Sequence, residues 1–430
     1  MLYNENMRVL FISANTEQIN MPTLPLGLVC VATATEKIGH DVRVVDLLNQ
    51  PDVRMVIREA LEEFRPDVIG ISLRNIDDQC MKNTKFLLDQ EKGVVTDCRD
   101  FSNAQVVVGG AGYSIYPEAS LAYVGADMGI QGEGEKAFPA LIARIQERAG
   151  LEGIPGLYLP GRGLQSPRVF TQDLDGIPLP DHHLWRSCNL NFPEFWIPFP
   201  IKRGCPMNCS YCSTPAIEGN AIRRRSPGAI VEGIARHVEA GFRHFYFTDN
   251  IFNIPSSYAR KICRSLIAQR LGISWMCIIY PEQIEEDLVK DMASAGCSEV
   301  SLGFESGSER ILRIMNKRYK PDDVQQTSQL LVDYGIRQTG FLLLGGPGET
   351  KGSVEESLAF ADSLPLDTLK VTVGVRIYPN TALAERAVDE GMITADDNLL
   401  LPKFYLVRGL EDWLYETVSR WMAKRPHWVM

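Results

Sequence analysis

Residues 196–212 read Trp-Ile-Pro-Phe-Pro-Ile-Lys-Arg-Gly-Cys-Pro-Met-Asn-Cys-Ser-Tyr-Cys, an apolar run followed by three closely spaced cysteines. The apolar run predicts a buried strand, and the residues after it predict a loop. Thiolates select zinc or iron–sulfur clusters, and an iron–sulfur cube usually has four thiolate ligands. Cys205, Cys209 and Cys212 alone would leave one iron of a cube open to a cofactor or substrate. Zinc, the alternative, would need a fourth ligand, and the next twenty residues contain no Cys or His.

The sequence around this loop alternates strand and helix patterns. Strands are predicted at 197–202, 244–248, 274–279, 299–304, 338–344 and 370–375, and helices at 227–240, 256–270, 282–295, 321–334, 353–363 and 381–390. Six strand–helix units predict a partial (β/α)6 barrel over residues 194–390, with its chemistry at the carboxyl ends of the strands. Residues 391–430 form a short C-terminal extension with one predicted helix.

The N-terminal third predicts a second α/β domain. Apolar strand runs at 8–13, 41–46, 67–72, 105–109 and 127–131 alternate with helix patterns at 26–39, 53–64 and 133–148. Such runs predict a doubly wound parallel sheet over residues 1–150. A Gly- and Pro-rich linker with room for a small hairpin follows at 151–193.

Open parallel sheets bind ligands at the carboxyl ends of their strands. Here those ends read Ser13-Ala-Asn15, Ser72-Leu-Arg-Asn75, Gly109-Gly-Ala-Gly112 and Gly132-Glu-Gly-Glu135. They are small and polar, as a ligand-facing rim should be. No Gly-x-Gly-x-x-Gly follows the first strand, which disfavours a nicotinamide site. A purely structural or dimerising domain is the alternative.

The composition is that of a globular protein, with 45% hydrophobic and 23% charged residues and a net charge of −10. This charge disfavours nucleic acid as a partner, and the one basic run, Arg223–Arg225, suits a solvated loop equally. No signal peptide or membrane span is evident, so we expect a cytoplasmic protein with reduced thiols. The seven other cysteines are expected to be small buried hydrophobes: Cys30, Cys80, Cys98, Cys188, Cys263, Cys277 and Cys297.

The cysteine loop resembles the signature of the radical S-adenosylmethionine (SAM) superfamily, Cys-x-x-x-Cys-x-aromatic-Cys, with Tyr211 at the aromatic position. The resemblance implies a [4Fe–4S] cluster on Cys205, Cys209 and Cys212, whose open iron chelates SAM. One electron, from an external reductant of the flavodoxin or ferredoxin type, would cleave SAM to a 5′-deoxyadenosyl radical. The cofactor carries this chemistry, and the protein holds and shields it.

Further resemblances fall at predicted strand ends. Phe247–Phe252, Gly303–Gly307, Asn316–Arg318, the glycine-rich segment Gly340–Thr350 and Arg376–Thr381 are similar to family segments around SAM. They imply contacts to the SAM ammonium, ribose, carboxylate and adenine. The residues so implied are Tyr211, Asp249, Asn250, Glu305, Arg318, Gly345, Gly346, Arg376 and Tyr378. Asp249 could instead cap a turn, and Arg318 could be a surface charge.

The domain order resembles the cobalamin-binding class of this superfamily. The resemblance implies cobalamin on the N-terminal rim, at Pro25, Leu26, Gly27, Ser72, Arg74, Asn75, Gly109, Gly110, Gly132, Glu133 and Gly134. The Asp-x-His-x-x-Gly motif of other cobalamin proteins is absent, so no His ligand to cobalt is expected. His40 lies beyond the first helix, on the opposite edge, and Arg74 and Asn75 are candidates for the lower face of cobalt.

Three enzymatic functions and one binding function follow from these resemblances. The leading hypothesis is C-methylation of an unactivated carbon of a small molecule or natural product, with one SAM as methyl source and a second as radical source. The second is oxidation, cyclisation or rearrangement with the same cofactors. The third is methylthiolation of RNA or protein, which Cys30, Cys80 and Cys98 do not support by their positions. The last is a non-enzymatic sensor protein that holds an iron–sulfur cluster.

Overall fold

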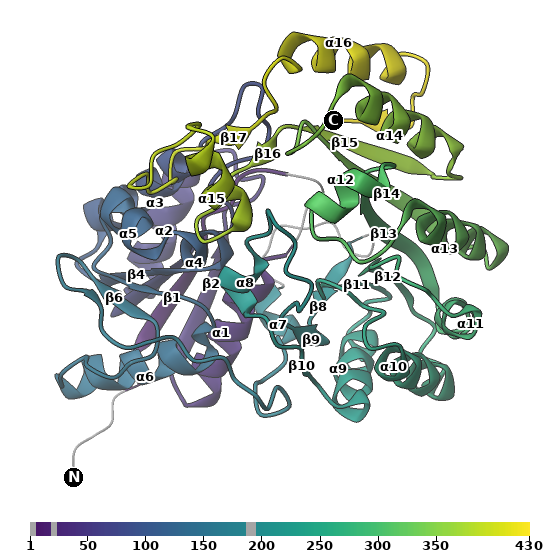
Figure 1. The fold of residues 1–430 in the computed structure, drawn as a ribbon. Coiled ribbons are helices and arrows are strands. Elements are labelled where there is room, and N and C mark those ends of the chain that lie inside the picture. Colours follow the sequence, from purple (N-terminus) through teal and green to yellow (C-terminus); the bar gives the residue numbers. More distant parts are fainter. Residues whose placement is uncertain (1–5, 19–23, 186–194) are drawn as a thin grey trace. The chain divides into compact units, whose positions relative to one another are not determined.

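The structure is a computed structural model that describes residues 6–18, 24–185 and 195–430. The chain divides into two compact units (Figure 1). Unit 1 comprises Met1–Asp78, Lys85–Phe195 and Ala216–Gly219, and unit 2 comprises Gln79–Thr84, Trp196–Pro215 and Asn220–Met430.

Unit 1 is built on one seven-stranded sheet. Its strand order is β2 (Asp41–Asp46), β1 (Arg8–Ser13), β3 (Val68–Ser72), β4 (Gln105–Gly109), β5 (Met128–Ile130), β6 (Leu157–Leu159) and β7 (Gly163–Leu164). The first five strands are parallel, while β6 and β7 pair antiparallel at the edge. The register sets Ser13 beside Ser72 and Ser72 beside Gly109, so three carboxyl ends share one rim.

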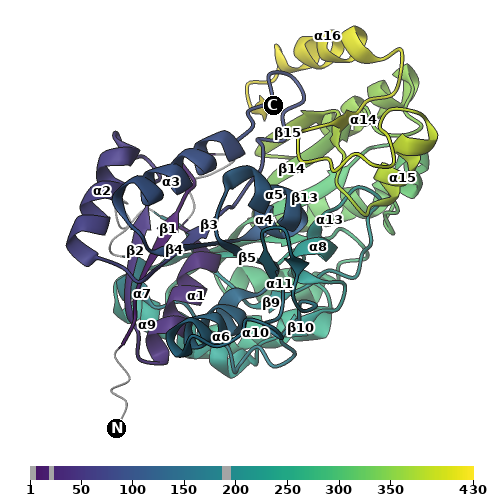
Figure 2. The ribbon, with the colours of Figure 1, turned by 90° about the vertical axis from the view of Figure 1, so that its left-hand side faces the viewer.

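Helices cover both faces of this sheet, as Figures 1 and 2 show. α1 (Leu26–Lys37) packs with α6 (Gly134–Glu147) on one face. The other face carries α2 (Val53–Phe64), α3 (Leu88–Phe101) and α5 (Pro117–Val124), while α4 (Ala111–Ile115) precedes α5 and α7 (His182–Trp185) packs on α1. The apolar strand runs are buried on both faces as a result, in keeping with a doubly wound sheet.

Unit 2 contains a second, curved parallel sheet. Its order is β18 (Trp428–Val429), β15 (Thr368–Val373), β14 (Arg337–Leu344), β13 (Cys297–Glu305), β12 (Ser274–Ile279), β11 (His244–Phe247) and β8 (Ile197–Phe199). Along β12 the buried residues Trp275, Cys277 and Ile279 alternate with half-buried ones. This period-2 pattern gives the strand one fully covered face and one partly open face.

Most helices of unit 2 lie along the outer side of its sheet (Figure 1). These are α9 (Pro227–Glu239), α10 (Ser256–Gln269), α11 (Glu286–Ser294), α13 (Pro321–Asp333) and α14 (Lys351–Ser363). The unit also contains α12 (Glu309–Ile314), α15 (Ala382–Asp389) and α16 (Glu411–Met422). Two short ladders complete the unit, β9 (Lys202–Arg203) with β10 (Arg223–Arg224) and β16 (Val375–Arg376) with β17 (Phe404–Tyr405).

The predicted α/β fold class is confirmed, with additions at the sheet edges. The hairpin expected in the linker is present as β6 and β7, and it adds antiparallel strands to a sheet that we predicted to be parallel. β18 adds a seventh parallel strand to the six of the partial barrel. Among the described residues, none of the helices is both long and apolar enough to cross a membrane.

Candidate functional site

The three cysteines lie in the loop between β9 and β10, just after β8 at the carboxyl edge of the unit 2 sheet. The antiparallel pairing of β9 with β10 closes the base of this loop. Cys205, Cys209 and Cys212 are all half-buried and unoxidised. Burial raises the pKa of Cys205 and of Cys209, and the neighbouring Cys212 raises both further. The three thiols therefore lie near one another in the loop.

The donor set is of the kind that an iron–sulfur cluster takes. Cys205, Cys209 and Cys212 supply three soft thiol groups on one loop, and thiolates select zinc or iron–sulfur clusters. An iron–sulfur cube usually has four thiolate ligands. Three cysteines therefore fit a cube with one open iron.

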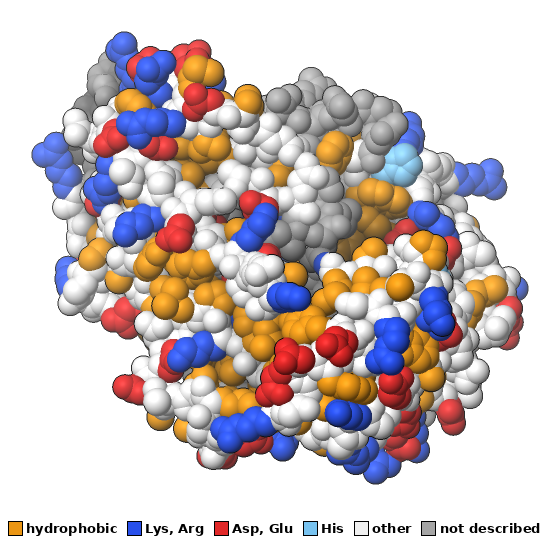
Figure 3. Space-filling model, turned by 90° about the horizontal axis from the view of Figure 1, so that it is seen from above, with side chains coloured by type: hydrophobic (Ala, Val, Ile, Leu, Met, Phe, Trp, Pro, Cys, Tyr) orange, Lys and Arg blue, Asp and Glu red, His pale blue; other side chains and the backbone are white. Residues whose placement is uncertain are grey.

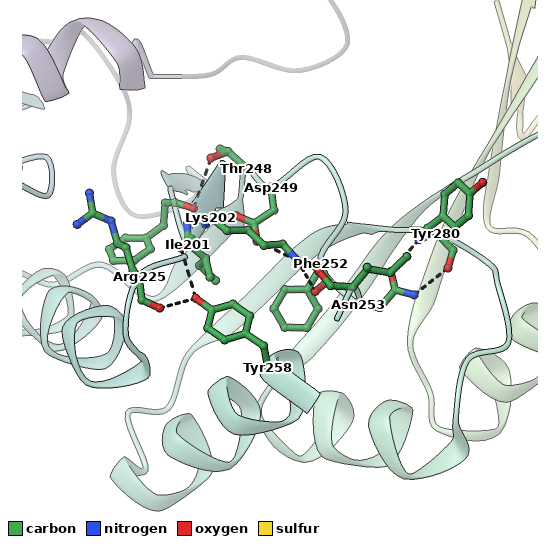
Figure 4. A network of polar contacts seen from close by, with 11 residues as sticks. Ile201, Lys202, Arg225, Thr248, Asp249, Phe252, Asn253, Tyr258 and Tyr280 are labelled. Carbon is green, nitrogen blue, oxygen red and sulfur yellow. Dashed lines mark hydrogen bonds and ion pairs between the residues drawn. The ribbon is translucent and has the colours of Figure 1, made fainter. Parts of the chain in front are cut away.

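Asp249 and Lys202 anchor the start of the cysteine loop (Figure 4). The fully buried Asp249 carboxylate accepts hydrogen bonds from the backbone N–H groups of Ile201 (3.2 Å) and Lys202 (3.0 Å). Its second oxygen lies 3.9 Å from the Lys202 ammonium. The sequence predicted that Asp249 would meet the SAM ammonium, but the structure places it at the backbone of β9, as a turn cap would be.

The Lys202 ammonium forms hydrogen bonds with main-chain carbonyl groups. It donates to the carbonyl oxygens of Phe252 (2.9 Å) and Ile254 (2.6 Å), which follow β11 (Figure 4). Burial lowers the pKa of Lys202, and the nearby Asp249 opposes that shift. Lys202 was not among the predicted site residues, because a lysine at a strand end looks like any surface charge in the sequence.

Asn250, by contrast, faces the cysteine loop. The Thr214 hydroxyl lies 3.4 Å from the Asn250 side-chain oxygen and 3.2 Å from the Cys212 sulfur. The residue after β11 that we predicted at the SAM site is therefore connected to a cluster ligand through one hydroxyl group.

Glu305 ends β13 and forms a buried ion pair. It has a φ of +59° and lies at a register shift between β13 and β14, a backbone conformation that is uncommon for non-glycine residues. Its carboxylate lies 3.3 Å from the Lys317 ammonium, and that ammonium lies 5.3 Å from the centre of the Tyr211 ring. Burial by itself lowers the pKa of Lys317, but the neighbouring phenols and Glu305 hold it well above its ordinary value.

Of the two adjacent basic residues, Lys317 is the buried one. The predicted residue, Arg318, is exposed, and its guanidinium donates to the carbonyl oxygen of Pro206 at 3.2 Å. Its backbone N–H donates to the Tyr280 hydroxyl at 2.9 Å. Arg318 thus contacts the cysteine loop, while Lys317 shares the interior with Glu305 and Tyr211.

The glycine-rich segment after β14 is folded around Glu349. The buried Glu349 carboxylate accepts hydrogen bonds from the backbone N–H groups of Gly345 and Gly346. Gly345 has a φ of +93°, which a side chain would strain. Burial raises the pKa of Glu349 to about 7, and the two amide hydrogen bonds oppose the rise. The glycines predicted at the SAM site are therefore held in one turn by a carboxyl group.

Arg376 and Tyr378 follow β15 as predicted. The buried Arg376 guanidinium donates hydrogen bonds to the backbone. It donates to the carbonyl oxygens of Ile377 (2.7 Å), Lys403 (3.3 Å) and Leu399 (3.0 Å). Its guanidinium carbon lies 5.3 Å from the centre of the Tyr378 ring. Arg376 thereby connects the chain before α15 with the chain after it.

The predicted cobalamin residues of unit 1 lie on the rim of its sheet or beside it. Gly110 has a φ of +108°, and a Cβ atom there would come within 2.6 Å of the Leu73 carbonyl oxygen. A Cβ on Gly112 would meet the Arg74 backbone at 3.1 Å. The loops after β3 and β4 therefore touch backbone to backbone, and Ser72, Arg74, Asn75, Gly109 and Gly110 form one surface.

The loop after β5 and the start of α1 complete this rim. The Gly132 N–H donates to the Ser114 hydroxyl at 2.9 Å, which ties the loop to α4. The Glu133 carboxylate accepts from the Thr171 N–H at 2.8 Å, so its charge is used by the chain that follows β7. At the start of α1, after Pro25 and Leu26, a Cβ on Gly27 would meet nothing within 4 Å. Gly27 is exposed, whereas a Cβ on Gly134 would meet the Val31 side chain at 2.8 Å.

Histidine lies elsewhere in unit 1. The His40 ring accepts a hydrogen bond from the Met7 N–H, before β1 and on the opposite edge of the sheet. His183 pairs with Glu36 in the last turn of α1 at 3.0 Å. No rim loop contains a His in its sequence. The absence of a His ligand to cobalt stays a prediction.

The scattered cysteines and the arginine run 223–225 are mostly interior. Five of the seven scattered cysteines are buried as expected: Cys30, Cys98, Cys263, Cys277 and Cys297. Cys80 is exposed, contrary to that expectation, and Cys188 lies outside the described residues. Arg223 and Arg225 are buried, so the run 223–225 is not a solvated basic loop. On the face shown in Figure 3, Lys and Arg alternate with Asp and Glu, which leaves no continuous basic surface there for phosphates.

Comparison with known proteins agrees with this arrangement. Residues 199–361 match the radical SAM superfamily and residues 12–142 match the B12 binding domain. The two matches cover the strands of unit 2 that carry the cysteine loop and the strands of unit 1 that form the rim. The chain belongs to the radical SAM superfamily, among the members that carry a B12-binding domain.

Three curated relatives span most of the chain. An uncharacterized methyltransferase of Pyrococcus horikoshii is 28% identical over 97% of this chain and 91% of its own length. Tryptophan 2-C-methyltransferase of Streptomyces laurentii is 24% identical over 87% and 74%. Cytidylyl-2-hydroxyethylphosphonate methyltransferase of Streptomyces wedmorensis is 26% identical over 79% and 73%.

Solved structures share the fold. The radical SAM methyltransferase TsrM from Kitasatospora setae, with cobalamin and a [4Fe–4S] cluster bound, superposes with a TM-score of 0.80 at 23% identity, over 90% of this chain and 75% of that one. The cobalamin-dependent radical enzyme OxsB superposes with a TM-score of 0.78 at 16% identity, over 97% and 67%. These likenesses confirm the two-part fold.

Proposed function

We propose that this enzyme transfers a methyl group from SAM to a carbon atom of a small organic molecule. The observation that carries the proposal is that one chain joins a three-cysteine loop at the carboxyl edge of one sheet to a B12-binding domain. Three relatives that share this order over most of their length are named methyltransferases, which favours methyl transfer over oxidation, cyclisation or methylthiolation. Tryptophan, in the name of one relative, is the first substrate to try.

The residues of unit 2 suit the cluster and SAM. When bound, these groups supply the one-electron cleavage of SAM, and cobalamin supplies a carrier for the methyl group. Cys205, Cys209 and Cys212 would hold three irons and leave the fourth for SAM. Glu305, an acceptor-only group when ionised, suits hydroxyl donors, and Lys317 beside it would attract the SAM carboxylate. We therefore assign the cationic role to Lys317, next to the Arg318 that the sequence had suggested.

The rim of unit 1 would hold cobalamin with no His ligand to cobalt. Arg74 follows β3 and is half-buried, and its backbone packs on Gly112. A guanidinium below the cobalt would oppose electron withdrawal without coordinating the metal. Arg74→Ala should change the cobalamin absorption spectrum and slow turnover; an unchanged spectrum with parental turnover would remove Arg74 from the proposal.

The cluster also needs an electron donor that the chain does not contain, and we propose an external flavodoxin- or ferredoxin-type protein. Its electron is consumed at the cluster, so the donor need not approach the substrate.

The test is an anaerobic assay of reconstituted protein supplied with cobalamin, SAM and tryptophan. We expect about four irons per chain, cobalt in the purified protein, and a methylated product besides 5′-deoxyadenosine. Cys209→Ala should lose the cluster, whereas the matched control Cys80→Ala, outside the loop, should retain it. Formation of 5′-deoxyadenosine without any methylated product, across tryptophan and related small molecules, would replace methyl transfer by a radical reaction of another kind.

A further inference from the structure

The stretch from Arg310 to Lys320 is the most basic short segment near the cysteine loop. It contains five Lys or Arg residues and no Asp or Glu, in a chain whose net charge is −10. It comprises most of α12 and the turn before α13 (Figure 1). Apart from the buried Lys317, its basic residues, Arg310, Arg313, Arg318 and Lys320, are exposed.

This segment holds the cysteine loop by three hydrogen bonds. The Ser210 N–H donates to the Met315 carbonyl oxygen at 3.1 Å. The Asn316 amide donates to the Asn208 carbonyl oxygen at 2.7 Å, and Arg318 donates to that of Pro206 at 3.2 Å. Residues 206, 208 and 210 directly adjoin Cys205 or Cys209, so each bond joins the segment to a neighbour of a cluster ligand.

The cysteine loop reaches the surface at this same point. Asn208 and Asn316 are both exposed and both lie in the left-handed region, with φ of +53° and +60°. Asparagine tolerates this conformation better than most residues, so two tight turns meet here. The exposed Asn208 directly precedes Cys209, so a few covalent bonds lead from the surface to that thiol. Because electron tunnelling falls steeply with distance, a donor gains most by docking where a ligand lies so near the surface.

The acidic residues around the segment leave it basic. Glu309 accepts from Arg313 and lies 3.8 Å from Lys320. Asp322 and Asp323 open α13, and Asp323 accepts from the Lys320 backbone N–H. On the exposed face these three acids oppose four bases, since Lys317 is buried against Glu305, so the face keeps an excess of one positive charge (four minus three).

We propose that the exposed face of residues 310–320 is the docking surface for an acidic one-electron carrier protein. The inference rests on the proposed function and names the partner surface of the same site. The carrier's reduced flavin or iron–sulfur centre loses one electron, the cluster gains one, and no bond forms or breaks. Complementary charge would steer the carrier to the surface and raise its association rate.

The experiment compares two double charge reversals in the cluster-loaded full chain. Arg313→Glu with Lys320→Glu changes the proposed surface, where these side chains are 73% and 65% exposed. Lys261→Glu with Lys290→Glu makes the same charge change on exposed positions of α10 and α11. Photoreduced flavodoxin is the donor, and the readout is the rate at which the visible absorption of the cluster bleaches at low ionic strength.

We expect the surface variant to be reduced at least about tenfold more slowly than the parent, and the control within about twofold. Added salt should slow the parent and leave the surface variant unchanged. Photoreduced 5-deazaflavin, a small donor, should reduce all three proteins at one rate. The proposal is overturned if flavodoxin reduces the surface variant at the parental rate, if the control slows equally, or if 5-deazaflavin also reduces the surface variant slowly. Normal cluster reduction without SAM cleavage would instead refute the proposed function and leave the docking surface standing.

Discussion

Replacing Lys317 by Met should destabilise unit 2 by about 3 kcal/mol. The Lys317 ammonium lies 3.3 Å from the Glu305 carboxylate, and the side chains are only 6% and 16% exposed. Two unit charges at this separation attract each other by about 5 kcal/mol at an effective dielectric constant of about 20. Once the ammonium is gone, water reaches part of Glu305 and recovers some of that energy, which lowers the expected loss to about 3 kcal/mol.

A double-mutant cycle measures this pair directly. Lys317→Met, Glu305→Gln and the combined variant would be unfolded in urea and followed by tryptophan fluorescence, since five of the six tryptophans belong to unit 2. We expect a coupling energy of about 2 kcal/mol, because the double variant leaves no unpaired buried charge. Lys320→Met is the matched control: its side chain is 65% exposed and 3.8 Å from Glu309, so its loss should stay below about 0.5 kcal/mol. A coupling energy no larger than that of the control would show that Glu305 and Lys317 do not stabilise each other.

Three further predictions concern buried groups. In the described chain one Glu91 carboxylate oxygen has no hydrogen-bond partner, and burial raises the Glu91 pKa well above 4.5. A carboxyl group with a raised folded-state pKa stabilises the protein at low pH. Unit 1 should therefore lose about 1.4 kcal/mol per pH unit from about 4.5 up to that raised pKa, and no more beyond it. Glu91→Leu should abolish this slope in hydrogen exchange of α3 peptides. A Cβ on Gly129 would lie 1.9 Å from the buried Tyr113 hydroxyl. Gly129→Ala should therefore lower the free energy of unfolding by at least about 2 kcal/mol, measured by thermal unfolding. The control is Gly93→Ala in α3: a Cβ there would meet nothing within 4 Å, so this substitution should stabilise the helix. Glu349 has a pKa of about 7. The free energy of unfolding should therefore fall by about 3 kcal/mol as the pH rises from about 4.5 to about 7. Glu349→Gln should remove this fall when urea midpoints are compared at about pH 5 and about pH 8.

The strands were predictable because buried strands leave apolar runs in the sequence, and β1, β2 and β4 have the predicted bounds. Helix α3 was missed for a physical reason. Its sheet-facing stripe consists of Leu88, Glu91, Val94, Val95 and Cys98, and the carboxyl group of Glu91 interrupts the apolar period that would have revealed it. The helix could not be predicted from its apolar period because a buried acidic residue lies on its covered face.

The choice between neighbouring basic residues could not be made from the sequence either. Lys317 and Arg318 follow a short helix in a turn, where no period distinguishes inside from outside. Only the fold shows that Lys317 points to Glu305 and that Arg318 reaches the Pro206 carbonyl. The strand ends that carry the site were predictable, but the directions of individual side chains were not.

Charge at a strand end is therefore weak evidence of a ligand contact, and the structure supplies a sharper criterion. Asp249 and Arg376 were predicted as site residues, and Glu349 lies in the glycine-rich segment that was predicted at the site. Each of these three charged groups forms hydrogen bonds with backbone groups that shape a loop. Hydrogen bonds of this kind to a charged group are worth about 1.5–3 kcal/mol each, so the loops depend on these three residues. Glu305 and Lys317 pair side chain to side chain instead, so a bound cofactor could replace either partner's contact without unfolding a loop. We accordingly expect recognition of SAM by charge to fall on Glu305 and Lys317, and the other three to hold the frame around it.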